Sequence, residues 1–112
     1  MLKYHNKKTV CHGITFASKK EAERYIYLSR LQATKQIVNL ELQPKYLICE
    51  GFRHDGKKER DRYYIADFRY IKNGILIVED VKSPFTKKLP LYRLKRHIFL
   101  QKYGQTLTFL ET

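Results

Sequence analysis

The sequence has no long apolar run and no low-complexity linker, and each absence narrows the class of protein. No stretch approaches the roughly 18–20 apolar residues of a membrane-spanning helix, so we expect no membrane segment. Residues 1–10 lack the apolar core of a signal peptide, so we expect a cytoplasmic protein. No internal repeat divides the 112 residues. A chain of this length is expected to form a single domain over residues 1–112, with residues 1–15 as a basic N-terminal arm.

Cysteine is scarce, because the chain contains only Cys11 and Cys49. In a reducing compartment, two widely separated cysteines are expected to be free thiols rather than a disulfide. A zinc site built with His12 and His54 is the alternative reading. The paired spacing of cysteine or histidine ligands that such sites use is absent, which disfavours it.

Acidic residues are outnumbered about two to one: 11 aspartates and glutamates face 23 lysines and arginines, for a net charge of +12. Basic domains of this kind usually bind a polyanion, most often nucleic acid. An anionic membrane surface is a weaker alternative, because no strongly apolar amphipathic helix accompanies the charge. An acidic protein partner is a third. Apolar residues make up 43% of the chain, which is enough for a core and argues against disorder.

Local signals predict the order helix, three strands, helix, strand. Ser18 begins a capping box of the form S-x-x-E, and helix formers follow to about Lys35. The remaining expected elements are a strand from near Pro44, an exposed turn or long hairpin loop over 53–62, strands over 63–71 and 75–82, a helix from Pro90 to about Tyr103 with Gly104 as its C′ residue, and a last strand over 106–111. We therefore expect an α/β fold with a mixed four-stranded sheet flanked by helices.

The segment "IADFRYIKNGILIVEDVKS", residues 65–83, reads as a β-hairpin that carries charge where strands disfavour it. Asn73-Gly74 is the strongest short hairpin signal, and as a two-residue turn it places Asp67 directly opposite Asp80. Their Cβ atoms would then lie about 4.5–5.5 Å apart. Lys82 shares this face with Asp80, whereas Glu79 points the other way. A register slip of one residue would put Glu79 opposite Asp67 instead.

Two carboxylates this close repel each other, and a divalent cation such as Mg²⁺ or Mn²⁺ would offset the repulsion. Lys82 beside them can position the attacking water or stabilise charge developing on a phosphate. In a strongly basic protein this set favours hydrolysis of a phosphodiester. The alternative is a solvated face with a weak salt bridge of roughly 0–1 kcal/mol. Apolar neighbours expected on the same face disfavour that alternative, namely Ile65, Leu76 and Val78.

Glu21 and Gln43 are further site residues by position. Glu21 lies in the first turn of the first helix, where it would serve either as a third carboxylate ligand or as the capping-box partner of Ser18. Gln43, directly before Pro44, would either line the site or form hydrogen bonds where the strand begins. Position alone leaves both choices open.

These motifs resemble those of the PD-(D/E)XK nuclease superfamily. The matching residues are Asp67 in "IADF", Asp80-Val81-Lys82 in "VEDVKS" and the helix glutamate Glu21 in "FASKKEAERY"; Ala66 stands in place of the proline. More narrowly, several segments are similar to small phage and prophage proteins related to Holliday-junction resolvases and to the endonuclease subunit of Tn7-like transposition. Those segments are "ITFASKKEAERYIYLSRL", "IVNLELQPKYLI", "YIADFRYI", "VEDVKS" and "YRLKRHIFLQKYG".

The resemblance implies a restriction-endonuclease-like αβββαβ core and a Mg²⁺-dependent DNA endonuclease. It implies that Glu21, Asp67, Asp80 and the Val81 carbonyl hold one or two Mg²⁺ or Mn²⁺ ions, and that Lys82 is catalytic. Gln43 and Lys95 would line the site. The implied substrate is branched DNA, cut by a homodimer in the cytoplasm of a bacterial host, where phage recombination proteins are possible partners.

Two basic segments are expected to contact the DNA backbone, where positive charge supplies affinity without base specificity. Their residues are Arg53, Lys57, Lys58, Arg60, Arg62, Lys87, Lys88, Arg93 and Arg96. One alternative function is a non-catalytic nucleic-acid-binding module on the same fold, although such a module has no use for adjacent carboxylates that repel phosphate. Another is a nuclease subunit that cuts only within a larger recombination or transposition complex.

Overall fold

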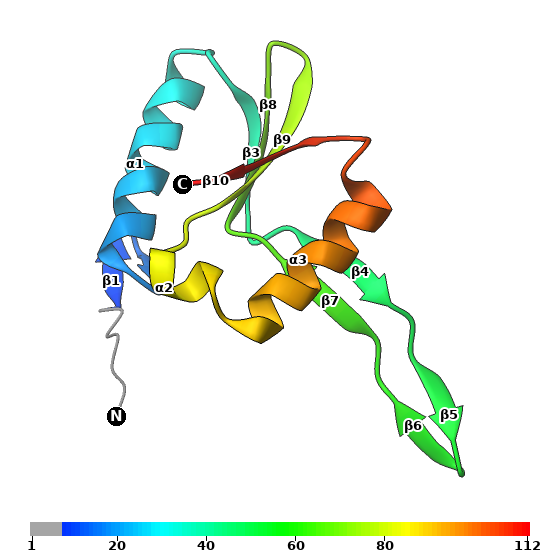
Figure 1. Ribbon diagram of the computed structural model, residues 1–112. Coiled ribbons are helices and arrows are strands. Elements are labelled where there is room, and N and C mark those ends of the chain that lie inside the picture. The colour runs from blue at the N-terminus through cyan, green and yellow to red at the C-terminus, as the bar shows by residue number, and fades with distance from the viewer. Residues whose placement is uncertain (1–7) are drawn as a thin grey trace.

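The computed structural model describes residues 8–112 and is built on a four-stranded mixed sheet with a helix on each face (Figure 1). The strand order is β10 (Thr108–Glu111), β9 (Ile75–Asp80), β8 (Phe68–Lys72) and β3 (Val38–Leu42). β8 runs antiparallel to both of its neighbours, and β10 runs parallel to β9. The predicted α/β class and mixed sheet are confirmed.

Helix α1 (Lys19–Ala33) covers one face of the sheet. It begins as predicted, because the Ser18 hydroxyl accepts a hydrogen bond from the Glu21 amide at 3.1 Å. It ends two residues before the expected end. Lys35 has a left-handed φ of 65°, which is incompatible with a right-handed helix. The core on this face consists of Phe16, Ala22, Leu28, Ile37, Phe68, Tyr70 and Val81.

Helix α3 (Pro90–Tyr103) covers the other face, over a second core of Ile48, Tyr64, Ala66, Val78 and Phe99. Gly104 follows it as predicted but is not left-handed, since its φ is −60°. A side chain there would lie 2.5 Å from the Leu100 carbonyl oxygen, which explains the glycine by close approach rather than by backbone conformation. A short helix that was not predicted, α2 (Pro84–Lys87), precedes α3 and is capped by Ser83. Among residues 8–112, no helix is long and apolar enough to cross a membrane.

Two of the predicted strands are placed differently in the structure. Strand β4 (Lys45–Cys49) begins near Pro44 as expected, but it pairs with β7 (Arg62–Ile65) outside the four-stranded sheet. The strand expected over 63–71 is divided into β7 and β8, because the Ala66 amide bonds to Pro44 whereas the Asp67 amide bonds to Glu79. The first strand of the sheet is instead β3, which was not predicted.

The expected loop over 53–62 is an ordered β-ribbon. Strands β5 (Phe52–His54) and β6 (Lys57–Glu59) pair antiparallel around Asp55-Gly56, where both residues have positive φ. This ribbon continues β4 and β7 and projects away from the sheet (Figure 1). Within the expected N-terminal arm, β1 (Thr9–Cys11) and β2 (Ile14–Phe16) form a second hairpin; residues 1–7 lie outside the described part of the chain.

Candidate metal centre

The β8–β9 hairpin brings its charged residues to the end of the ladder. Asn73 and Gly74 have φ values of 50° and 77°, and Lys72 pairs with Ile75 as the turn predicts. The same register continues to Phe68 opposite Glu79 and then stops. Asp67 therefore follows the last ladder pair, and its Oδ2 accepts a hydrogen bond from the Val81 amide at 2.7 Å. The predicted register is confirmed, but a direct ladder pair between Asp67 and Asp80 is not formed.

Lys82 lies between the two aspartates. Its Nζ is 3.3 Å from Asp80 Oδ1 and 3.8 Å from Asp67 Oδ2. Asp80 is fully buried and the Asp67 side chain is 13% exposed, so the group is not a solvated face. Val78 is buried beside it as expected, whereas Ile65 is 53% exposed and does not shield the charges.

The two oxygens of Asp80 have different surroundings. Oδ2 accepts a hydrogen bond from the Tyr64 hydroxyl on β7. Oδ1 is buried and has no hydrogen-bond partner within residues 8–112, although it forms an ion pair with the ammonium of Lys82. A buried carboxylate oxygen without a hydrogen bond is costly. The ammonium of Lys82 offsets part of that cost, and a divalent cation bound there would offset more.

Glu21 faces the same region from the first turn of α1. Its carboxyl lines a cavity together with Asp67, whereas its main-chain amide donates to the Ser18 hydroxyl of the cap. It lines two cavities of about 130 Å³ each, one shared with Lys20, Val81 and Lys82 and the other with Gln43 and Asp67. The fold thus brings Glu21 to the aspartates from a distant part of the sequence.

The two residues expected to line the site lie beside the carboxylates. Gln43 shares a cavity with Glu21 and Asp67, and its main-chain N–H donates to the main-chain carbonyl of Asp67 at 2.9 Å. Its φ of 51° is left-handed, which is rare before a proline and typical of functional sites. Lys95, on α3, lines a cavity of about 160 Å³ with Asp80 and Lys82.

The crowding of carboxyl groups changes their acidity. Burial raises the pKa of Asp67 to about 7; the charge of Lys82 opposes this rise, and the charge of Asp80 adds to it. Burial likewise raises the pKa of Glu21, again opposed by Lys82. Both raised pKa values favour a proton on one of these neighbouring carboxyl groups. A divalent cation would take the place of that proton.

The donor set fits a hard cation, although it is not arranged around one. Among the described residues, no three His, Cys, Asp or Glu side chains are spaced to hold a metal ion as they stand. The reason at this site is that the ammonium of Lys82 lies between Asp67 and Asp80, so a shared cation would displace it. Carboxylate oxygens are the ligands that Mg²⁺ and Mn²⁺ prefer, and the unbonded Asp80 Oδ1 is available to them.

The zinc alternative has no support in the described residues. Cys11 in β1 and Cys49 in β4 are both free thiols, and no group of cysteines and histidines is spaced to hold a metal ion. The expectation of two free cysteines is confirmed.

Sequence reasoning assigned no role to Glu79, which is completely buried on the α1 side of the sheet. It forms an ion pair with Arg24 and accepts hydrogen bonds from Tyr70 at 2.7 Å and Thr112 at 2.9 Å. An acidic residue on the inward face of a strand requires a cation nearby. Arg24, on the helix that covers this face, is the residue from which the ion pair could have been predicted.

Lys20 and Tyr64 also escaped notice in the sequence. Lys20 Nζ donates to the main-chain oxygens of Lys82 at 3.3 Å and Thr112 at 2.9 Å, which ties α1 to the end of β9. No local pattern distinguishes Tyr64 from the other tyrosines, because its contact with Asp80 depends on how β7 packs.

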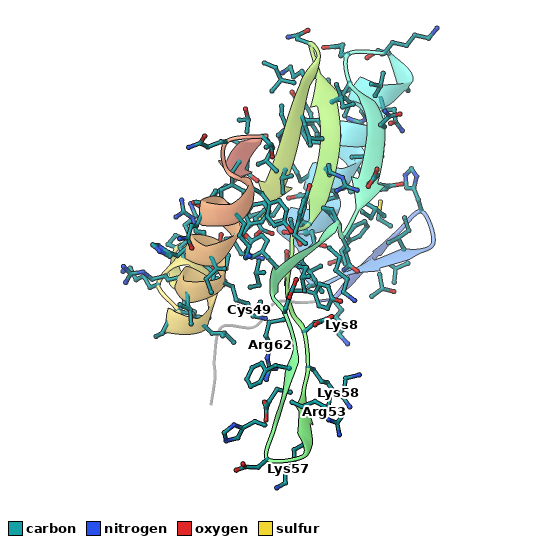
Figure 2. The ribbon with its side chains drawn as sticks, turned by 90° about the vertical axis from the view of Figure 1, so that its right-hand side faces the viewer. Lys8, Cys49, Arg53, Lys57, Lys58 and Arg62 are labelled. Carbon is teal, nitrogen blue, oxygen red and sulfur yellow. The ribbon has the colours of Figure 1, made fainter. Side chains whose placement is uncertain are left out.

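The basic residues expected to contact DNA form two separate groups. Lys87, Arg93 and Arg96 line a cavity of about 260 Å³ with His97, and Lys88 is exposed at the end of α2. The second group lies on the β5–β6 ribbon and at its base: Arg53, Lys57, Lys58, Arg60 and Arg62 (Figure 2).

One family model matches residues 1–111 of the chain, and its description is "Protein of unknown function (DUF1064)". No curated protein and no solved structure matches the chain.

Proposed function

The chain belongs to the DUF1064 family, whose description names no activity, and from the site alone we propose that it is a divalent-metal-dependent nuclease that hydrolyses phosphodiester bonds in DNA. Asp80 carries the proposal. It is completely buried, Tyr64 holds its Oδ2, and its Oδ1 has no hydrogen bond although Asp67 and Lys82 are beside it. Such a buried carboxylate, with the ammonium of Lys82 as the charge partner of Oδ1, is costly to the folded protein, and costly groups of this kind cluster at functional sites.

Each residue of the centre has a role in this proposal. Glu21, Asp67 and Asp80 would hold the cation together with the Val81 carbonyl. The bound cation supplies Lewis-acid stabilisation of charge on the phosphate. Lys82, released from the aspartates, would direct its ammonium to the attacking water or to the phosphate oxygens. Lys95, which lines the same cavity as Lys82, would neutralise further charge on the substrate.

The order of elements around the sheet supports the proposal. Along the chain, the sheet and its covering helices run α1, β3, β8, β9, α3, β10, which is the helix–three strands–helix–strand order expected of a PD-(D/E)XK nuclease. Asp67 directly precedes the second of these strands, and Asp80 ends the third. The basic groups on the ribbon and on α3 are suited to a polyanionic substrate.

The resemblance in sequence extends the proposal to substrate and assembly. We include branched DNA as the substrate and a twofold dimer as the active form, because resolving a four-way junction requires two symmetric cuts. The place of action in this proposal is the cytoplasm of a bacterial host, alongside phage recombination proteins.

The test is cleavage of a labelled four-way junction and of a linear duplex of the same sequence, each with Mg²⁺. We expect symmetric nicks in the junction by the wild type and none by Asp80→Asn. A matched pair on α1 provides the control: Glu21→Gln should lose cleavage, whereas Glu23→Gln, exposed on the same helix, should retain it.

The other outcomes separate the parts of the proposal. Equal cutting of both DNAs, lost in Asp80→Asn, would retain the nuclease and reject the junction as its preferred substrate. Binding without cleavage by the wild type would overturn the nuclease as an independent enzyme. It would favour a binding module, or a subunit that needs partner proteins.

A further inference from the structure

The β5–β6 ribbon has no packing role in the described protein. Every residue from Phe52 to Arg62 is exposed, and the ribbon shares no core cluster with the sheet (Figure 2). An isolated two-stranded hairpin is only marginally stable in water. The ribbon therefore adds little to the stability of the fold, and both of its faces are open to a partner.

The two faces of the ribbon carry different side chains at their paired positions. Arg53 lies directly opposite Lys58, so one face presents a pair of cations (Figure 2). The opposite face carries the pairs Phe52–Glu59 and His54–Lys57. Like charges directly opposite destabilise a hairpin. Among residues 8–112 neither Arg53 nor Lys58 forms an ion pair, and the guanidinium of Arg53 bonds only to the Gly56 carbonyl at 3.1 Å.

Of the carboxylates near these cations, Asp55 and Asp61 are occupied elsewhere, and Glu59 lies on the opposite face of the ribbon. Asp61 accepts hydrogen bonds from the Gly51 amide at 2.6 Å and the Tyr63 hydroxyl at 3.3 Å, which holds it at the base of the ribbon. Asp55, at the tip, lies 3.4 Å from the His54 imidazole. Arg53 and Lys58 are therefore available to an external anion.

We propose that the β5–β6 ribbon is a docking arm that lies in the major groove of double-stranded DNA to one side of the cut. This inference rests on the proposed function. The major groove of B-form DNA is about 12 Å wide and admits a two-stranded ribbon, whereas the deep, narrow major groove of double-stranded RNA does not. The cationic face would contact phosphates, and the 61%-exposed Phe52 on the other face would contact the groove floor, where thymine presents a methyl group.

The connection from ribbon to site limits how far the arm extends. From its tip at Asp55-Gly56, the chain runs through β6 and β7 directly to Asp67. At about 3.3 Å per extended residue, this path spans at most about 36 Å. Since DNA rises about 3.4 Å per base pair, the tip of the arm reaches at most about ten base pairs of duplex from the cut.

Binding to DNA of graded length tests the arm, measured by fluorescence anisotropy in chelator so that no strand is cut. The ribbon variant is Arg53→Glu with Lys58→Glu. Its control is Lys35→Glu with Lys72→Glu, the same charge change at two exposed lysines outside the ribbon. Because the changed side chains are exposed, thermal unfolding should show both variants folded.

For the wild type, affinity should rise as duplex beside the junction lengthens to about ten base pairs, and then level off. The ribbon variant should lose at least tenfold in affinity for long duplexes and little for short ones. Its salt dependence should weaken by about two phosphate contacts. The control should lose less, and equally at every length. Equal loss by both variants, loss independent of length, or the same ribbon dependence on RNA duplex would overturn the arm.

Cleavage by the same proteins separates this inference from the nuclease proposal. If the wild type cuts DNA and the ribbon variant binds like its control, the arm is rejected and the nuclease stands. If the wild type never cuts but binding depends on ribbon and length as described, the nuclease is rejected and the arm stands.

Discussion

Tyr64 and Asp80 are joined by a buried hydrogen bond from the phenol to Oδ2, and this bond fixes which Asp80 oxygen faces Lys82. Burial raises the pKa of Tyr64, and the neighbouring charge of Asp80 raises it further. The phenol therefore remains protonated, and remains a donor, throughout the physiological pH range. The Asp80 oxygen that would bind the proposed cation is thus set by a residue from a different pair of strands.

Replacing Tyr64 with phenylalanine should weaken Mg²⁺ binding about 10- to 100-fold, the usual effect of removing a group that orients a metal ligand. Calorimetric titration of the folded variant with Mg²⁺ measures this directly. The control is Tyr103→Phe, which removes a tyrosine hydroxyl from its bond to the Leu47 carbonyl, away from the cavities of the site. Unchanged Mg²⁺ affinity in Tyr64→Phe would show that the bond does not position Asp80.

Asp67 should make the stability of the protein depend on pH in an unusual direction. Its pKa is about 7 in the folded protein, against an ordinary value of 3.8, so between these values the folded chain holds a proton that the unfolded chain has lost. In chelator, the free energy of unfolding should therefore decrease as the pH rises from about 4 to 7.

Asp67→Asn should remove this slope and be the more stable protein at pH 7. Urea unfolding at several pH values, each in chelator, measures both effects. A slope that persists in Asp67→Asn would assign it to other groups, such as Glu21. Adding Mg²⁺ at pH 8 should stabilise the wild type but not the variant, because binding requires the Asp67 carboxylate.

Lys82→Met should separate metal binding from catalysis. The ammonium that lies between the aspartates is lost, while all the expected oxygen ligands remain. We expect cleavage to fall by about 10²–10³-fold, as when a group that stabilises transition-state charge is removed. Mg²⁺ should still bind, with a calorimetric titration as the readout. Loss of Mg²⁺ binding instead would mean that Lys82 supports the fold of the site rather than its chemistry.

Arg24→Ala should strongly destabilise the fold, because Glu79 is completely buried and would lose its cation. Breaking a buried pair in this way costs about 3 kcal/mol or more. The double variant Arg24→Met with Glu79→Gln should recover much of this loss, since Tyr70 can still donate to the amide oxygen and the Thr112 hydroxyl can accept from the amide nitrogen. Urea denaturation of the wild type, Arg24→Ala, the single variants Arg24→Met and Glu79→Gln, and the double variant provides the comparison. Simple additivity of the two single changes would contradict it.

Much of the fold could be predicted from local chemistry. Asn73-Gly74 determined the hairpin register because few residues tolerate positive φ at both turn positions, and Ser18 determined the start of α1 through its hydroxyl. The carboxylates and Lys82 could be placed near one another because β-strands alternate their side chains.

The elements that escaped prediction depend on contacts between distant segments. Strand β3 has apolar residues at alternate positions, Val38, Leu40 and Leu42. Asn39 between them has a left-handed φ, and the pairing with β8 is irregular beside it, so the segment lacks a regular strand pattern. The break between β7 and β8 arises because Ala66 and Asp67 bond to different partners, Pro44 and Glu79. No short window of sequence contains such information.

The pairing of β10 with β9 has a consequence for synthesis of the protein. Thr112 donates its amide to Asp80 and accepts from the amide of Lys82 and the ammonium of Lys20. Asp80 and Lys82 are therefore held in position by the end of the β10 segment, which leaves the ribosome after them. Until that strand docks, a nascent chain carries the carboxylates without the backbone bonds that hold Asp80 and Lys82, so the centre forms only once translation has passed residue 112.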